Sequence, residues 1–262
     1  MIARLGEAWL VCAAIQLALW AVQEKTRNAG IVDVGWAASF TAVAGLFGLT
    51  ASAPTSAFLP LGILVVLWST RLACYLVLRG AATGPEEGRY VTLRQRWGLR
   101  ASKRFLAFFQ AQAALVAALA SAFVVPFVAE PWDNGAVRTL GILVALTGVG
   151  GEALADLQLL RWKREPANRG RVCEVGLWSY SRHPNYFFEW TVWLGIAIYN
   201  LAFWSSGGWI ALAGQGIILA SIFGVTGIPP TENQAIQSKG EAYRQYQRRV
   251  SKFFPLPPRR GI

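Results

Sequence analysis

The sequence predicts an all-α, polytopic membrane protein with about seven transmembrane helices. Three observations predict this class. The 262 residues are 54% hydrophobic and only 15% charged, which is too apolar a composition for a soluble domain of this size. Several apolar runs approach the roughly 20 residues that a helix needs to cross a hydrocarbon core. The lysines and arginines gather in alternate loops between these runs, as the positive-inside rule requires.

The expected spans run, in order, over residues 5–23, 31–51, 58–79, 105–128, 136–160, 186–204 and 208–228. Glycines and prolines interrupt the second and third spans, and although membrane helices tolerate both residues, one of these spans could be re-entrant. The basic loops follow the first, third, fifth and seventh spans. We therefore expect the N-terminus outside and the C-terminus in the cytoplasm of an integral membrane protein.

The formal charge of +11 consequently lies on one side of the membrane. Topogenic signalling and attraction to anionic lipid could account for most of it, and in the alternative interpretation part of the charge binds a phosphorylated cofactor. A nucleic-acid partner is not expected, because the basic residues are spread over membrane-proximal loops without a binding module. One histidine and three cysteines without ligand spacing predict no metal site and no disulfide framework. The sequence indicates no oligomeric state.

Two cytoplasmic loops, 80–103 and 161–184, are long for a helical bundle, and loops of this length tend to be functional or disordered. The first contains Leu93 to Trp97, which could form a short interfacial amphipathic helix. After Pro229, a polar tail predicts one helix that is capped by Thr231 and runs through Arg249.

Glu152 and Asp156 lie four residues apart near the cytoplasmic end of the fifth span, on one side of that helix. Two carboxylates at the membrane boundary are costly unless they are hydrogen-bonded or face a ligand. They could accept hydrogen bonds from a ribose or an amide. Alternatively they pair with basic residues such as Lys163 or Arg182 at the head-group level.

The richest polar stretch runs from Gly176 to Trp190 and holds the only histidine of the chain. Pro184 suits the first position of a helix, and the free N–H groups behind it form an anion site together with Arg182. The stretch thus offers a phosphate clamp, an amide and a hydrogen-bond acceptor within about one helical turn. The candidate ligand-binding residues are Arg182, His183, Asn185, Tyr186 and Glu189. In the alternative interpretation, His183 caps a helix and Tyr186 belongs to an interfacial aromatic belt.

Asp33 and Arg71 are single charges within or near apolar runs. Because lipid-facing charges cost about 2.5–3.5 kcal/mol on insertion scales, we expect both to face the interior, and they could pair with each other. Glu232 begins the tail helix, where the helix dipole favours an acid. The tail residues Tyr243, Tyr246 and Arg249 could fold back over a cytoplasmic cofactor.

These residues resemble the C-terminal domain family of the steroid 5α-reductases, in particular its bacterial branch. The resemblance covers nearly the whole chain and is carried by Ile31 to Trp36, Arg71 to Arg79, Arg89-Tyr90, Glu152 to Gln158, Gly176 to Glu189, and Pro230 to Pro255. A similar Arg-His-Pro-x-Tyr signature occurs in sterol reductases and in isoprenylcysteine carboxyl methyltransferases. The chain departs from the steroid enzymes at Glu152, where they carry asparagine, and it lacks a clear match to their substrate-gripping Gln-Glu pair.

The resemblance implies a single membrane domain, residues 1–262, with the helices of 1–104 on the substrate side and 105–262 on the cofactor side. It implies an NADPH-dependent reductase of a conjugated C=C bond in a lipophilic enone, located in the bacterial inner membrane with the cofactor site facing the cytoplasm. Asp33, Arg71 and Tyr90 would be its catalytic donors or stabilisers. The resemblance assigns Asp156, Asn185, Tyr186 and Glu189 to the cofactor. Together with the other polar residues of these segments, the expected cofactor-binding set is Glu152, Asp156, Gln158, Lys163, Arg182, His183, Asn185, Tyr186, Glu189, Glu232, Tyr243, Tyr246 and Arg249.

Two other functions stay open at this point. An S-adenosylmethionine-dependent membrane methyltransferase would use a similar Arg-His-Pro-x-Tyr turn with an acid such as Glu232. A non-enzymatic lipid-binding or scaffold protein would also tolerate basic cytoplasmic loops, but it gives no reason for Asp156, Asn185 and Glu189 to converge.

Overall fold

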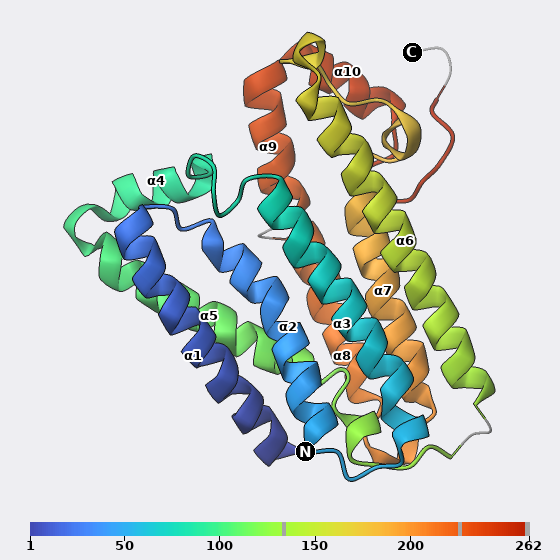
Figure 1. The fold of residues 1–262 in the computed structure, drawn as a ribbon. Helices are drawn as coiled ribbons and strands as arrows, with labels where there is room; N and C mark the ends of the chain where they lie inside the picture. Colours follow the sequence, from blue (N-terminus) through green and yellow to red (C-terminus); the bar gives the residue numbers. More distant parts are fainter. Residues whose placement is uncertain (133–134, 225–226, 260–262) are drawn as a thin grey trace. The chain divides into compact units, whose positions relative to one another are not determined.

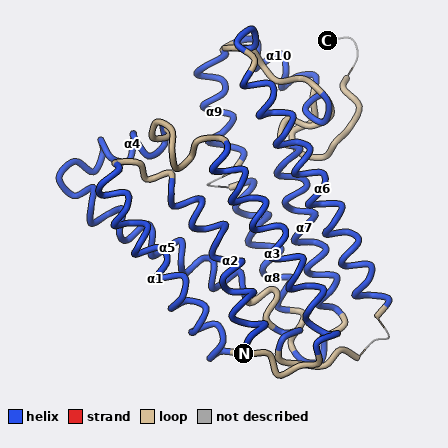
Figure 2. The backbone as a smooth tube through the Cα atoms, in the orientation of Figure 1, coloured by secondary structure: helices blue, strands red, loops and turns tan. Residues whose placement is uncertain are grey.

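The computed structural model describes residues 1–132, 135–224 and 227–259. Helices joined by loops make up this described part, which contains no β-strand (Figures 1 and 2). The chain divides into two compact units. The N-terminal unit comprises residues 1–137 and 200–211, and the C-terminal unit comprises residues 138–199 and 212–262. Each unit is described by itself below.

In the N-terminal unit, α1 (Ile2–Thr26) packs against α5 (Ala101–Ala120) and α2 (Ile31–Leu49), and α2 also packs against α3 (Thr55–Leu78). Its interior is aromatic: the ring of Phe40 contacts Trp68 edge-on, with centroids 5.1 Å apart, and both side chains are almost fully buried. Edge-to-face pairs of this kind stabilise a core beyond the area they bury.

The short helix α4 (Gly88–Trp97) is held by the loop between α1 and α2. Glu86 accepts hydrogen bonds from the backbone N–H of Ala29 and from the guanidinium of Arg94, at 2.8 and 2.7 Å. The Asn28 amide donates to the carbonyl oxygen of Gly84 at 2.9 Å. The structure confirms a helix at residues 93–97, although it begins earlier than expected.

In the C-terminal unit, α6 (Ala136–Arg164) and α7 (Pro184–Leu201) approach closely at glycines. A Cβ atom on Gly148 would lie 2.6 Å from the backbone nitrogen of Val192, and one on Gly195 would lie 2.4 Å from that of Ala145. Small residues of this kind let membrane helices pack backbone to backbone. The expected start of α7 at Pro184 is confirmed.

The tail does not form the single helix predicted from the sequence. α8 (Ile210–Phe223) is followed by α9 (Ile228–Lys239) and α10 (Glu241–Arg249), which are separated at Gly240. Gly240 has a φ of 56°, a conformation that glycine adopts without steric cost and that ends a helix. The capping role expected for Thr231 is also wrong, because Thr231 lies inside α9 and its hydroxyl donates to the carbonyl oxygen of Gly227.

Five stretches of the described residues are long and apolar enough to cross a membrane: α1, α2, α3, α6 and the stretch Ile210–Lys239 that contains α8 and α9. This confirms the membrane character of the chain, but not the count of seven or the orientation of the termini. The other two expected spans form α5 and α7, of 20 and 18 residues. Both carry polar side chains, such as Gln110 in α5 and Glu189 in α7, which lower their apolar character.

Candidate functional site

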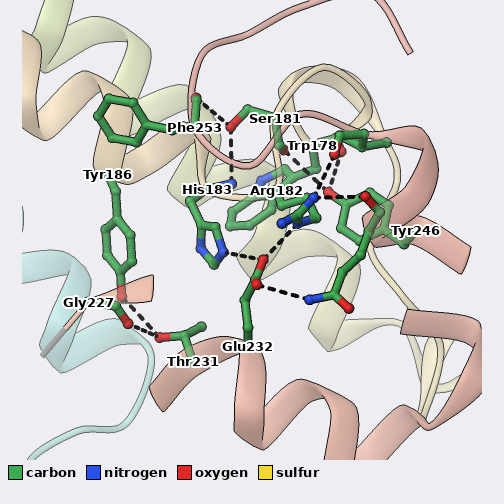
Figure 3. A network of polar contacts seen from close by, with 12 residues as sticks. Trp178, Ser181, Arg182, His183, Tyr186, Gly227, Thr231, Glu232, Tyr246 and Phe253 are labelled. Atoms are coloured by element: carbon green, nitrogen blue, oxygen red, sulfur yellow. Dashed lines mark hydrogen bonds and ion pairs between the residues drawn. The ribbon is translucent and has the colours of Figure 1, made fainter. Parts of the chain in front are cut away.

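A buried polar network lies where the loop before α7 meets α9 and α10 (Figure 3). The Glu232 carboxylate is its centre. Its Oε1 accepts a hydrogen bond from Nε of Arg182 at 2.7 Å and lies 3.2 Å from Nε2 of His183, while Oε2 accepts from the Gln247 amide at 2.9 Å. Arg182 is 7% exposed and His183 2% exposed, so the network is an internal one.

The Arg182 guanidinium is further occupied by the protein backbone. Its Nη1 donates to the carbonyl oxygens of Gln247 and Val250, at 3.0 and 2.8 Å. A buried charge is tolerated only when it is paired and hydrogen-bonded. The sequence predicted that Arg182 binds a phosphate. In the structure its guanidinium is instead occupied by Glu232 and by carbonyl oxygens of the tail.

The turn from Trp178 to His183 is built from side-chain bonds to backbone groups. The Ser181 hydroxyl donates to the carbonyl oxygen of Phe253 at 2.7 Å and accepts from the backbone N–H of His183 at 3.1 Å. The Tyr246 hydroxyl donates hydrogen bonds to the carbonyl oxygens of Trp178 and Ser181. These contacts, drawn in Figure 3, fix the direction in which His183 and the start of α7 point.

The imidazole of His183 stacks on the ring of Tyr186, with centroids 5.4 Å apart and the planes 5° from parallel. The Tyr186 hydroxyl lies 3.3 Å from the Thr231 hydroxyl. Burial lowers the pKa of His183 below its ordinary value, although the neighbouring Glu232 carboxylate acts in the opposite direction. His183 is therefore neutral near pH 7, with a proton on Nε2 to donate to Glu232.

Two carboxylates of α6 are buried beside the first turn of α7. Glu152 is 4% exposed and Asp156 3% exposed. The amide nitrogen of Asn185 lies 3.4 Å from Oδ1 of Asp156. The structure thus brings Asp156 and Asn185 together, as expected, and it places a carboxylate, a second acid and an amide within one region of the C-terminal unit.

Most of the remaining residues of the expected cofactor set contact other parts of the protein, through hydrogen bonds, an ion pair or ring packing. Gln158 accepts a hydrogen bond from the backbone N–H of Leu177, at 2.9 Å, and supports the loop. Glu189 accepts from the Trp193 indole one turn later in α7 at 3.0 Å. Lys163 is exposed near the end of α6. Arg249 forms an ion pair with Glu174 at 2.9 Å, and Tyr243 is buried against Tyr246.

In the N-terminal unit, Asp33 does not pair with Arg71, the partner that the sequence suggested. Its carboxylate forms an ion pair with Arg89 and accepts a hydrogen bond from the Tyr90 hydroxyl at 2.9 Å. The Tyr90 ring is 2% exposed in the core. Burial, and then the charge of Asp33, raise the pKa of Tyr90, so its hydroxyl stays protonated.

Arg71 instead lines an open cavity of about 660 Å³ in the same unit, whose lining includes the exposed side chains of Leu59, Ile63 and Leu67. The cavity wall is almost entirely apolar, with Thr70, Arg71 and Cys74 toward the end of α3 and Gly45 and Gly48 on α2. A Cβ atom on either glycine would meet open space. The volume falls within the range of about 300–1,000 Å³ typical of small-molecule sites.

The sequence analysis missed Ser181, Gln247 and the carbonyl oxygens of the tail. The spacing of α10 held a signal for Gln247, because it lies four residues after the buried Tyr243 and so shares its face. The return of the tail to the turn, a bridge between Ser181 and Ser251, had no local signal.

The fold and these sites define a helical membrane protein with a buried polar network beside one helix start. The chain belongs to the family described as protein of unknown function DUF1295, whose model matches residues 19–250. An uncharacterized protein of the fission yeast Schizosaccharomyces pombe is 28% identical over 276 positions, which cover 90% of this chain and 75% of that protein. No solved structure matches the chain.

Proposed function

We propose that the protein is a membrane-embedded, NADPH-dependent reductase of a conjugated C=C bond in a lipophilic enone. One observation carries the proposal: Glu152 and Asp156 are buried in a membrane-spanning helix, and Asp156 contacts the Asn185 amide. Ionisable groups at such positions are costly and usually serve a ligand. The resemblance to the steroid 5α-reductases assigns this aspartate and this asparagine to the cofactor.

The residues fit the polar parts of such a cofactor. Carboxylates accept from ribose hydroxyls or a carboxamide, and the Asn185 amide both donates and accepts. The ring of Tyr186, which is partly exposed and stacks on the buried His183, provides a flat aromatic surface. When bound, NADPH would supply the hydride, and the chain would hold the reactants and exclude water.

The N-terminal unit offers the groups that a lipophilic substrate needs. Its 660 Å³ apolar cavity would take the body of the enone. The Tyr90 hydroxyl, which stays protonated and donates to Asp33, and the Arg71 guanidinium are the candidate stabilisers of enolate charge. Oxyanion stabilisation of this kind is often the largest single contribution to catalysis.

Titration of the purified protein with NADPH tests the proposal. We expect saturable binding by the wild type, strong loss of binding in Asn185→Ala and Asp156→Asn, and unchanged binding in Gln245→Ala, a control at an exposed position of α10. Melting curves of each variant separate lost binding from lost folding. An absence of saturable NADPH binding by the folded wild type would refute the reductase.

One observation favours an S-adenosylmethionine-dependent methyltransferase as the second candidate. Arg182 is already neutralised by Glu232 and grouped with His183. A methyl donor without phosphates needs fewer free cations than NADPH, and the isoprenylcysteine methyltransferases use a similar turn with an acid. Saturable binding of S-adenosylmethionine in the same titration, without binding of NADPH, would select this function.

A further inference from the structure

A second cavity, of about 230 Å³, lies in the C-terminal unit along the tail. Its charged lining is entirely basic and consists of Arg182, Arg248, Arg249, Lys252 and Arg259. No acidic side chain is among the described residues that line it. A concave surface lined by one sign of charge concentrates the potential that attracts a counter-ion.

Three of these five cations have carboxylate partners: Arg182 pairs with Glu232, Arg249 with Glu174 and Arg248 with Glu241. The other two, Lys252 and Arg259, form no ion pair with a carboxylate in the described part of the chain. Both side chains are exposed. The cavity therefore keeps uncompensated positive charge at two exposed positions, which a soluble anion or a lipid head group can reach.

The backbone that carries these cations is held in place. The backbone N–H of Arg259 donates to the carbonyl oxygen of Arg249 at 3.0 Å. The backbone N–H of Leu256 donates to the carbonyl oxygen of Tyr180 at 3.0 Å. The backbone N–H of Arg182 donates to the carbonyl oxygen of Ser251 at 2.8 Å, and both residues also line the cavity. Because the backbone is already ordered, an anion would not need to organise it upon binding.

A topogenic role alone does not require this arrangement. The positive-inside rule needs lysine or arginine in a short loop, and it is indifferent to whether those residues surround a cavity. The tail instead bends so that Arg259 returns to Arg249 and encloses a space. That space is large enough for a tetrahedral oxyanion and its first substituents.

We propose that this pocket is a phosphate-binding site, in which Lys252 and Arg259 bind the anion and Arg248 lies at its rim. Guanidinium groups match phosphate oxygens with two parallel hydrogen bonds, and an ammonium adds a point charge. The phosphate can belong to a soluble phosphate ester or to the head group of an anionic phospholipid. The site does not depend on the reductase proposed above, because a methyltransferase or a scaffold could equally carry it.

Inorganic pyrophosphate is the soluble probe, added to the purified full-length protein in neutral detergent and followed by calorimetry. The test variant is the double substitution Lys252→Gln and Arg259→Gln. The matched control is Arg169→Gln with Arg171→Gln, which removes the same charge from exposed positions of another loop in the same unit. For a soluble ligand we expect the test variant to bind about tenfold or more weakly, since two charge-assisted contacts are lost. The control should stay close to wild type.

The lipid source is tested by reconstituting the same three proteins in phosphatidylcholine alone or with phosphatidylglycerol. If a head group occupies the pocket, phosphatidylglycerol raises the melting temperature of the wild type and of the control, but not of the test variant. A phosphate site is refuted if, with both probes, the test variant behaves like the control. Because neither readout involves NADPH, this result is independent of the outcome for the reductase.

Discussion

Arg182 and Glu232, which lie fifty positions apart in the chain, form a buried ion pair with Nε 2.7 Å from Oε1. The pair joins the loop before α7 to the first turns of α9. In this position neither charge has ready access to water, and each depends on the other for its compensation.

Removing one partner of this pair should be strongly destabilising. We expect Glu232→Gln to cost about 3–5 kcal/mol in the free energy of unfolding, because it leaves the Arg182 charge uncompensated in the interior. Glu241→Gln is the control, since Glu241 forms an exposed pair with Arg248 that is worth about 1 kcal/mol or less. Unfolding in detergent measures both; equal stability of the two variants would contradict the assignment.

The single histidine gives the protein a pH dependence of predictable sign. Burial lowers the pKa of folded His183, while Glu232 raises it and Arg182 and Lys252 lower it. Between the folded pKa and the ordinary value of about 6.5, the unfolded chain binds the extra proton, so stability is complete above about pH 6.5 and falls below it. Melting temperatures at pH 8, 7, 6 and 5 measure this effect.

His183→Gln is the comparison for that titration. Because the chain contains one histidine, a loss of stability between pH 7 and pH 5 that the wild type shows and the variant lacks belongs to His183. Parallel curves of melting temperature for the two proteins between pH 8 and 5 would mean that protonation of His183 does not destabilise the protein.

The glycine contact between α6 and α7 should be sensitive to added volume. Gly148→Val would place a Cβ atom 2.6 Å from the backbone nitrogen of Val192, and the helices would have to separate. We expect a loss of about 1–3 kcal/mol or more. Gly150→Val is the matched control on the same helix, because its Cβ meets nothing within 4 Å. Unfolding in detergent compares the stabilities of the two variants. Equal melting temperatures would show that α6 and α7 are not tightly packed at Gly148.

Tyr90→Phe tests the contact with Asp33 without removing the ring from the core. The lost bond from the hydroxyl to a carboxylate should cost about 1.5–3 kcal/mol. Under the reductase proposal, the variant also loses turnover of the enone. Tyr180→Phe is the control, because Tyr180 is 45% exposed and belongs to the other unit. If both variants melt like the wild type, the hydroxyl contributes nothing to stability.

The sequence predicted what depends on local patterns. Apolar runs predicted the helices, and Pro184 predicted the start of α7, because proline needs no N–H partner there. The contact between Asp156 and Asn185 could not be predicted from their spacing in the sequence. The loop that ends at Pro184 did indicate that the end of α6 and the start of α7 lie on the same side of the membrane. Gly240 was a readable signal for the break between α9 and α10 that the sequence analysis passed over.

Pairings between distant segments could not be predicted in this way. Arg71 was the only partner that the sequence suggested for Asp33, and the fold of the loop before α4 brings Arg89 to it instead. Likewise, nothing in the spacing indicated that Arg182 would be compensated by Glu232 and by carbonyl oxygens of the tail. Charge predicts that a buried group needs a partner, but not which one.

The return of Ser251 to Ser181 has a practical meaning for anyone who handles this protein. A tag, fusion or truncation placed just beyond Arg249 would act at the buried network itself, since Val250 and Phe253 supply acceptors to Arg182 and Ser181. A loss of stability in a shortened protein would then report collapse around the arginine rather than removal of an accessory segment.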